Sequence, residues 1–278
     1  KKRMKKTRVL YITQEITPHL PETPLSKIGR FLPQGIQEEG KEIRTFMPKY
    51  GCINERRHQL HEVIRLSGMN LIIDDADHPL IIKVASIQPA RMQVYFIDNE
   101  EYFKRKAVFT DADGKQFKDN DERAIFFCRG VIETVRKLGW APDIIHCHGW
   151  MTGLVPMYLK KSFDTDPIYA DTKVVYSLYN DETNGSLNKD FARKSLFDGV
   201  TMEDLSAVET PTYNNLQKLG AQYADGIIMG EETINAELNS YITSLEKPLL
   251  ECQLEESYIE QYSQFYDAIL ETEEVLVE

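Results

Sequence analysis

Short runs of apolar and β-branched residues alternate along the chain with longer amphipathic stretches. The runs predict strands at residues 9–13, 43–47, 143–148, 174–179 and 226–229. Apart from the second, these runs are almost continuously apolar, which is typical of parallel strands covered by helices on both faces. The alternation therefore predicts an α/β fold, with a parallel sheet whose strands are joined by crossover helices.

Two amphipathic stretches predict helices. In residues 121–138 apolar positions recur at helical spacing, Asn120 is placed to cap the helix, and Gly139 follows the last turn. Residues 254–270 carry an aromatic stripe opposite a strongly acidic side. We expect this last helix to dock back on the domain through its aromatic edge.

The remaining segments complete one domain over residues 1–278. Residues 70–98 contain apolar runs separated by polar turns, and they predict a small antiparallel insertion of two or three strands. Residues 180–210 are polar and contain turn-forming residues, so we expect a mobile loop there. Residues 1–8 form a basic tail.

Charge narrows the range of partners. The chain has 278 residues, with 33 Lys and Arg against 44 Asp and Glu, so its formal net charge is −11. Residues 1–8 carry six of the basic groups and no acid, and the rest of the chain therefore sums to −11 − 6 = −17. Such an acidic body repels phosphate backbones, which argues against nucleic acid and anionic membranes as partners.

Cysteine usage and hydropathy indicate the compartment. The four cysteines lie far apart without metal-binding spacing, so neither a disulfide framework nor a zinc framework is predicted. No apolar run approaches the roughly 20 residues that a membrane-spanning helix needs. We expect a cytoplasmic, reducing environment.

Polar candidates follow two of the predicted strands. His146 and His148 share one face at the end of a buried strand, where ligands of α/β sheets bind. A catalytic zinc site needs three protein ligands, and no third lies nearby, so we predict no metal. His148 is either a substrate-facing residue or a core histidine, and Tyr179 and Asn180 after the next strand can bind a sugar or pack in the core.

The loop after the first strand lacks a glycine-rich phosphate-binding motif. It contains three prolines, Pro18, Pro21 and Pro24, and a single glycine, Gly29. This composition favours a structural loop, and we predict no cofactor. Reasoning from the residues alone ends at an α/β domain with a polar site at its strand ends.

Several long segments nevertheless resemble bacterial glycogen/starch synthases. They are VLYITQEITPHLP, LPQGIQEEGKEIRTFMPKYGCI, VYFIDNEEYF, DNDERAIFFCRGVIETVRKLGWAPDIIHCHGWMTGLVPMYLK, KVVYSLYN and NLQKLGAQYADGIIMGEETINAEL. The resemblance covers most of residues 9–243. It implies the acceptor-side half of a GT-B arrangement of two Rossmann-like domains. The family transfers glucose, usually from ADP-glucose, to the non-reducing end of an α-1,4-glucan with retention.

The resemblance also implies which residues bind substrate. The residues that match substrate-binding positions of the family are His148, Trp150, Asn180, Asn120 and Arg123. Helix capping by Asn120 and core packing by Trp150 are open alternatives.

Other family positions are degenerate. The Lys-x-Gly-Gly-Leu-Gly-Asp-Val loop of the family aligns with residues 21–28, where Pro21 and Lys27 stand instead of its lysine, glycines and aspartate. Gly149 replaces an aspartate, Met151 replaces a sugar-contacting histidine, and Tyr179 replaces a histidine. Proline at a glycine position removes an N–H donor, so this loop should not bind a diphosphate as its relatives do.

The second, donor-binding domain of such enzymes is not contained in these 278 residues. We therefore expect negligible transferase activity from them alone, with an α-glucan or a sugar nucleotide as ligand. One alternative is catalysis together with a separately encoded donor domain or as a homo-oligomer. Another is a regulatory or structural subunit without carbohydrate contact.

Overall fold

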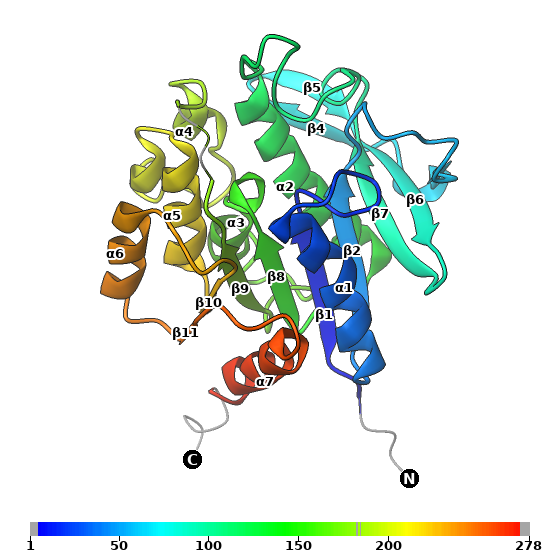
Figure 1. Cartoon of the computed structure of the whole chain (residues 1–278). Coiled ribbons are helices and arrows are strands. Elements are labelled where there is room, and N and C mark those ends of the chain that lie inside the picture. Colours follow the sequence, from blue (N-terminus) through cyan, green and yellow to red (C-terminus); the bar gives the residue numbers. More distant parts are fainter. Residues whose placement is uncertain (1–4, 182, 184, 273–278) are drawn as a thin grey trace.

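A computed structural model describes residues 5–181, 183 and 185–272, and its centre is a nine-stranded sheet of the order β11-β10-β9-β8-β1-β2-β7-β6-β3 (Figure 1). The strands of this sheet are β1 Arg8–Thr13, β2 Glu42–Pro48, β3 His61–Glu62, β6 Ile81–Ile87, β7 Met92–Asp98, β8 Ile144–His148, β9 Lys173–Leu178, β10 Gly226–Met229 and β11 Leu249–Leu250. All five predicted strands are present, with bounds that shift by one or two residues at most.

The order in which strands are added to the sheet reverses between β1 and β8. β1 pairs in parallel with β2 on one side and with β8 on the other. The first half of the chain continues outward from β2 to β7, and the second half runs from β8 through β9 and β10 to β11. This reversal of the strand order is a topological switch point. The connections that follow the two strands lead away from each other there and leave room for a ligand.

Residues 70–98 are predicted to form a small antiparallel insertion, but part of this segment belongs to the main sheet. β4 Asn70–Ile73 and β5 Ala76–Pro79 form a separate antiparallel hairpin. β6 and β7 are also antiparallel to each other, but β7 pairs in parallel with β2 and belongs to the main sheet. The consecutive buried residues 94–98 explain this difference, because a strand of the sheet interior is covered on both faces.

Helices cover both faces of the sheet (Figure 1). They are α1 Pro24–Glu38, α2 Asn120–Leu138, α3 Val155–Lys161, α4 Phe191–Lys194, α5 Tyr213–Tyr223, α6 Ala236–Ser244 and α7 Tyr258–Glu271. Within the described residues, no helix combines the length and the apolar character needed to cross a bilayer.

The central strand β1 supplies both halves of the core. Val9 and Tyr11 pack in the cluster that contains the buried side chains of α1 and α7. Leu10 and Ile12 point the other way, into the larger cluster with α2, α3 and α5. This alternation follows from the two-residue period of a strand.

Helix α2 begins at Asn120, which does not cap it as predicted. The preceding residue Asp119 occupies the N-cap position, and the Asn120 side chain bonds to other groups described below. The predicted end is correct, because Gly139 adopts a left-handed conformation with φ 64°.

Helix α7 begins one turn later than predicted, because Leu254 is 70 % exposed and precedes it. Its buried side chains include Tyr262, Tyr266 and Ile269. The Tyr266 hydroxyl lies 3.1 Å from the Tyr11 hydroxyl and 2.5 Å from Nδ1 of His146. These contacts join the last helix to the two central strands β1 and β8.

In the segment 180–210 the structure places the short helix α4 and a 3₁₀ turn, Ser206–Val208. Residues 182 and 184 of this segment lie outside the described residues. Its mobility stays a prediction.

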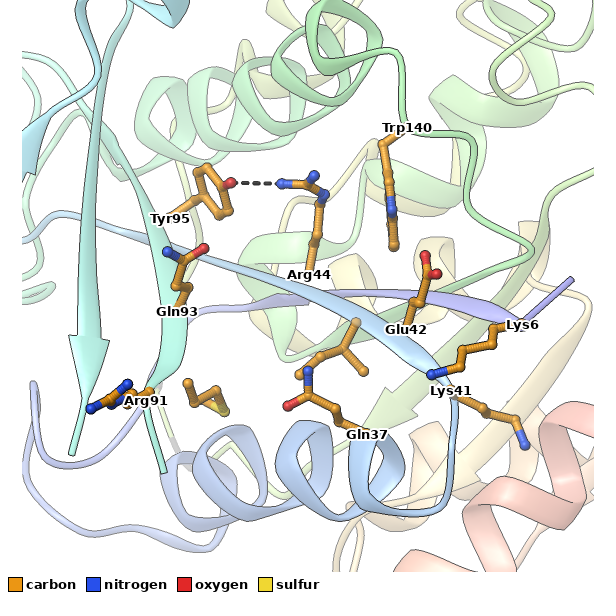
Figure 2. A pocket seen from close by; sticks show the side chains of 11 residues that line it. Lys6, Gln37, Lys41, Glu42, Arg44, Arg91, Gln93, Tyr95 and Trp140 are labelled. Carbon is orange, nitrogen blue, oxygen red and sulfur yellow. Dashed lines mark hydrogen bonds between the residues drawn. The ribbon is translucent and has the colours of Figure 1, made fainter. Parts of the chain in front are cut away.

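The amino ends of the parallel strands form one end of the sheet, here called the amino edge, and their carboxyl ends form the other, the carboxyl edge. The two differ in charge. At the amino edge, near the start of β2, basic and aromatic side chains surround a pocket that contains Arg44, Tyr95 and Trp140 (Figure 2). At the carboxyl edge, the loops that follow β1, β9 and β10 bring carboxylates together.

The α7 contacts predict that Tyr266→Phe destabilises the protein by about 1–3 kcal/mol, because the change leaves two buried polar partners without their hydroxyl. The measurement is the free energy of unfolding in urea. Tyr262→Phe is the matched control, since Tyr262 is a buried tyrosine of the same helix that has no hydrogen bond within the described part of the chain. Equal losses in the two variants would contradict the assigned role of the Tyr266 hydroxyl.

Candidate functional site

A cleft of about 380 Å³ opens at the carboxyl edge of the sheet, beside the switch point between β1 and β8. Its wall is built by residues that directly follow four neighbouring strands, together with the start of α1 and one loop aromatic. The lining residues are Gln14, Glu15, Thr23, Pro24, Leu25, Phe109, Trp150, Tyr179, Asn180, Asp181, Thr183 and Glu231.

The lining of this cleft is acidic. It includes the carboxylates of Glu15, Asp181 and Glu231, and among its described lining residues there is no lysine or arginine. Burial raises the pKa of Glu15, and the nearby charge of Asp181 acts in the same direction. A diphosphate entering this cleft meets negative charge without a cation to offset it.

The amino end of α1 is satisfied by its own residues. Thr23 and Ser26 form a reciprocal capping box: the Ser26 N–H donates to Thr23 Oγ1 at 3.0 Å, and the Thr23 N–H donates to Ser26 Oγ at 2.7 Å. Pro24 has no N–H to offer, and the Thr23 hydroxyl donates to the Glu15 carboxylate at 2.8 Å. Helix amino ends bind phosphate through free N–H groups, so this end is poorly suited to phosphate.

Pro21 and Lys27, which stand at the degenerate loop positions, have structural contacts. The carbonyl of Pro21 accepts a hydrogen bond from Ser26 Oγ at 3.0 Å. The Lys27 ammonium lies 3.6 Å from Glu22 and 3.5 Å from Glu255, outside the cleft. Its charge is therefore directed towards these two carboxylates, and Lys27 does not line the cleft.

Gly149 leaves space that Gln14 fills. A Cβ atom on Gly149 would lie 2.4 Å from Gln14 Oε1, and the backbone φ of 93° also favours glycine. Gln14 Oε1 accepts a hydrogen bond from the Met151 N–H at 3.1 Å. The Gln14 side chain therefore bridges the carboxyl ends of β1 and β8 across the switch point.

Met151 faces the core instead of the cleft. Its side chain is buried, and its sulfur accepts a hydrogen bond from the Tyr50 hydroxyl at 3.3 Å. Its carbonyl accepts from the Cys128 thiol at 3.2 Å. This position has no access to a ligand in the cleft.

His146 and His148 are buried with ring centroids 3.9 Å apart. His146 bonds to Tyr266 and, through Nε2, to Ser177 Oγ at 2.6 Å, while His148 Nδ1 bonds to the Tyr179 hydroxyl at 2.9 Å. Burial lowers the pKa of His148 to about 3 and that of His146 well below its usual range. Both rings are therefore neutral at physiological pH, and His148 lies behind Tyr179.

In the part of the chain that the structure describes, no three His, Cys, Asp or Glu side chains come together to hold a metal ion.

Trp150 forms the aromatic wall of the cleft. Its ring packs against Phe109, with centroids 4.9 Å apart, and edge-on against Tyr213 at 4.8 Å. Asn180 lies on the same wall, where its backbone N–H donates to Glu231 at 3.3 Å.

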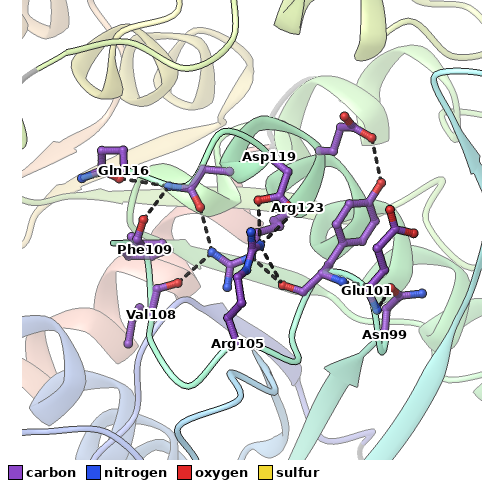
Figure 3. Close-up of polar contacts among 11 residues, drawn as sticks. Asn99, Glu101, Arg105, Val108, Phe109, Gln116, Asp119 and Arg123 are labelled. Carbon is purple, nitrogen blue, oxygen red and sulfur yellow. Dashed lines mark hydrogen bonds and ion pairs between the residues drawn. The ribbon is translucent and has the colours of Figure 1, made fainter. Parts of the chain in front are cut away.

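Asn120 and Arg123 contact each other and are not among the residues that line the cleft. Figure 3 shows the polar contacts around Arg123. Arg123 is fully buried, and its guanidinium donates to the carbonyls of Tyr102 and Val108 and to Asn120 Oδ1. Asn120 Nδ2 in turn donates to the carbonyl of Phe109 at 3.0 Å. These two residues hold the loop that presents Phe109 to Trp150, so they act on the cleft only through its wall.

Burial lowers the pKa of Arg123 to about 10, so its guanidinium stays charged at neutral pH within this ring of carbonyl acceptors.

The structure thus brings Trp150, Tyr179 and Asn180 into one cleft, with His148 directly behind it. It places Asn120, Arg123 and Met151 elsewhere. Sequence reasoning missed the following lining residues: Gln14, Glu15, Phe109, Asp181 and Glu231. The position of Gln14 and Glu15 directly after a predicted strand is a signal that could have identified these two.

Comparisons with known proteins agree with this architecture. A family model described as the starch synthase catalytic domain matches residues 8–250. The glycogen synthase of Chlorobium limicola is 38 % identical over 221 residues, which are 78 % of this chain and 44 % of that protein. The glycogen synthase of Pelodictyon phaeoclathratiforme is 36 % identical over 241 residues, which are 84 % of this chain and 48 % of that protein. The chain spans about half the length of these curated relatives.

Among solved structures, the catalytic domain of starch synthase IV from Arabidopsis thaliana, bound to ADP and acarbose, aligns with a TM-score of 0.72 and 18 % identity. The alignment covers 89 % of this chain and 51 % of that chain. This likeness confirms the predicted α/β fold, with the mostly parallel sheet of a GT-B starch synthase catalytic domain.

The buried histidines predict a loss of stability in acid. Below the unfolded pKa of about 6.5, the unfolded chain binds a proton at His148 while the folded chain does not, so stability falls as the pH drops from about 6.5 towards about 3. Between about pH 7.5 and about pH 5 we expect His148 to contribute about 2 kcal/mol of this loss. Urea unfolding across this range should show a shallower dependence for His148→Asn.

The control for this experiment is His61→Asn, at an exposed position of β3. A pH dependence of His148→Asn as steep as that of the unchanged protein would contradict the assignment.

The Gln14–Gly149 contact predicts coupled substitutions. Gly149→Ala should destabilise the protein by about 1–3 kcal/mol, because the new Cβ meets the Gln14 amide at a strained φ. Gln14→Ala removes the obstacle, so the double variant should be more stable than the sum of the single losses predicts. Strict additivity in urea unfolding experiments would show that the two side chains do not compete for this space.

Proposed function

Since this chain belongs to the starch/glycogen synthase family of glycosyltransferases, we propose that it is an acceptor-side domain whose cleft binds α-1,4-glucan. We propose further that these 278 residues have negligible independent transferase activity. The family reaction is retaining glucosyl transfer from ADP-glucose.

The observation that carries the proposal is the lining of the cleft at the switch point. The mostly buried rings of Trp150 and Tyr179, which are 2 % and 4 % exposed, line the cleft. Asn180 offers an amide, and Glu15, Asp181 and Glu231 offer carboxylate acceptors. Sugar hydroxyls donate to carboxylates, and the apolar face of a pyranose packs on aromatic rings. A neutral glucan fits this chemistry better than an anionic diphosphate does.

Transfer from a sugar nucleotide requires stabilisation of the departing diphosphate by positive groups. The cleft lining that the structure describes contains no lysine or arginine. At the start of α1, the capping box already uses the backbone N–H groups of Thr23 and Ser26. Removing a single electrostatic donor commonly lowers the rate by on the order of 100- to 1,000-fold. The cations for the leaving group therefore have to come from a donor half, and catalysis with such a half is the alternative reading.

We also place the protein in a reducing, cytoplasmic setting. Its four cysteines are all free, and Cys128 and Cys147 are buried without forming a disulfide.

Glucan binding is tested by tryptophan fluorescence. The chain has two tryptophans, so Trp140→Phe leaves Trp150 as the sole reporter. Titration of this variant with maltoheptaose should change its emission saturably. Asn180→Ala in the same background should weaken binding by about tenfold, since it removes one amide from the cleft. Absence of a saturable change would contradict glucan binding and favour a regulatory or structural subunit.

Turnover is tested separately with ADP-glucose and malto-oligosaccharides. We expect no sustained transfer by the purified 278-residue chain, nor by Met151→His, because position 151 faces the core and the described lining of the cleft contains no lysine or arginine. Sustained transfer by the purified chain alone would contradict the proposed inactivity while leaving glucan binding intact.

A further inference from the structure

A second pocket lies at the amino edge of the sheet, on the side opposite to the cleft. Its volume is about 400 Å³, within the range of roughly 300–1,000 Å³ that is usual for small-molecule sites. Its wall includes Lys6, the first residues of β2, the turn between β6 and β7, and Trp140 after α2. The proposed glucan function does not involve this pocket.

The lining of this pocket is basic in a protein whose net charge is −11. It contains Lys6, Lys41, Arg44 and Arg91 against the single carboxylate of Glu42. Two of these charges are already paired: Glu42 lies 3.0 Å from Arg8, and Lys41 lies 3.2 Å from Asp267. Lys6, Arg44 and Arg91 have no ion-pair partner among the described residues.

Arg44 is held at the centre of the pocket (Figure 2). Its Nη1 donates to the Tyr95 hydroxyl at 2.6 Å, and its guanidinium lies 5.3 Å from the ring centroid of Trp140. Its Nε is buried without a hydrogen-bond partner among the described residues. A partly exposed guanidinium held between two aromatic rings at the wall of a pocket is suited to a planar or tetrahedral oxyanion.

The rest of the lining favours a ligand in which the anion is attached to a polar group. Gln37 and Gln93 place amides at the wall. The Trp140 ring is 7 % exposed and lies beside the Arg8 and Arg44 guanidinium groups, so it adds a small apolar area to the lining. Lys6 and Arg91 stand at the rim as further cations. The carboxyl ends of α1 and α2 lie at this edge with about half a negative charge each, which the three full charges outweigh.

We propose that this pocket binds a phosphate monoester carried on a hydroxylated body, with Arg44 as the central phosphate ligand and Trp140 as the aromatic residue beside that ligand. The same chemistry occurs in a free sugar phosphate and in a phosphate ester on a glucan chain.

The experiment uses the Trp150→Phe variant, in which Trp140 is the sole tryptophan. At low ionic strength, where the Debye length exceeds about 10 Å, titration with glucose 6-phosphate should change its emission saturably, and glucose at the same concentration should not. A response to glucose 6-phosphate identifies a free sugar phosphate as sufficient. A response only to a phosphorylated dextrin identifies the polymer-borne ester and also supports the proposal.

Arg44→Gln should weaken binding by about tenfold or more, because it removes a charge-assisted hydrogen bond. Because Arg44 is part of an aromatic stack, Lys6→Gln/Arg91→Gln provides a second test at two exposed positions and should also weaken binding. The matched control is Arg65→Gln/Lys115→Gln, which changes the net charge equally at exposed positions away from the pocket.

A saturable response that survives in Arg44→Gln and in the Lys6/Arg91 double variant would overturn the proposal. So would equal weakening in the control pair, or no saturable response to either phosphate ester.

Discussion

The parallel pairing of β1 with both β2 and β8 is the constraint on which the rest of the structure depends. It places a strand with apolar side chains on both faces in the middle of the sheet, so that α1 and α7 cover one side and α2, α3 and α5 the other. It also separates the carboxyl ends of β1 and β8 at the switch point. The cleft is consequently a product of topology, and the residues after the strands decide only its chemistry.

The charge distribution follows from the same parallel arrangement. Loops after the strands gather at one edge and loops before them at the other, so acidic and basic residues that are interspersed in the sequence separate in space. The carboxyl edge collects Glu15, Asp181 and Glu231, whereas the amino edge collects Lys6, Arg44 and Arg91. The six residues of β1 separate the two edges by about 20 Å at roughly 3.3 Å per residue, which is about twice the screening length of about 10 Å at 0.1 M salt, so each edge attracts ligands mainly according to its own charge.

The sequence predicted the sheet well because buried parallel strands have almost continuous apolar runs. It predicted Trp150, Tyr179 and Asn180 for the cleft because these residues follow such runs directly. It could not assign β7 to the main sheet, since strand pairing depends on contacts between distant segments. Spacing on a helix also could not reveal that the Arg123 guanidinium turns into carbonyls of the preceding loop, and a role of Arg123 in substrate binding stays a prediction. The acidic lining was not apparent, since its carboxylates come from separate parts of the chain.

Gln14, Gly149 and Met151 form one packed unit at the switch point. Glycine at position 149 leaves room for the Gln14 side chain, which accepts a hydrogen bond from the Met151 N–H. Met151 is thereby held with its sulfur against the Tyr50 hydroxyl, inside the core. An aspartate at position 149 requires Gln14 to move, and moving Gln14 removes a bond that positions residue 151. Gln14, Gly149 and Met151 are therefore mutually dependent, and a change at one of them requires the others to move.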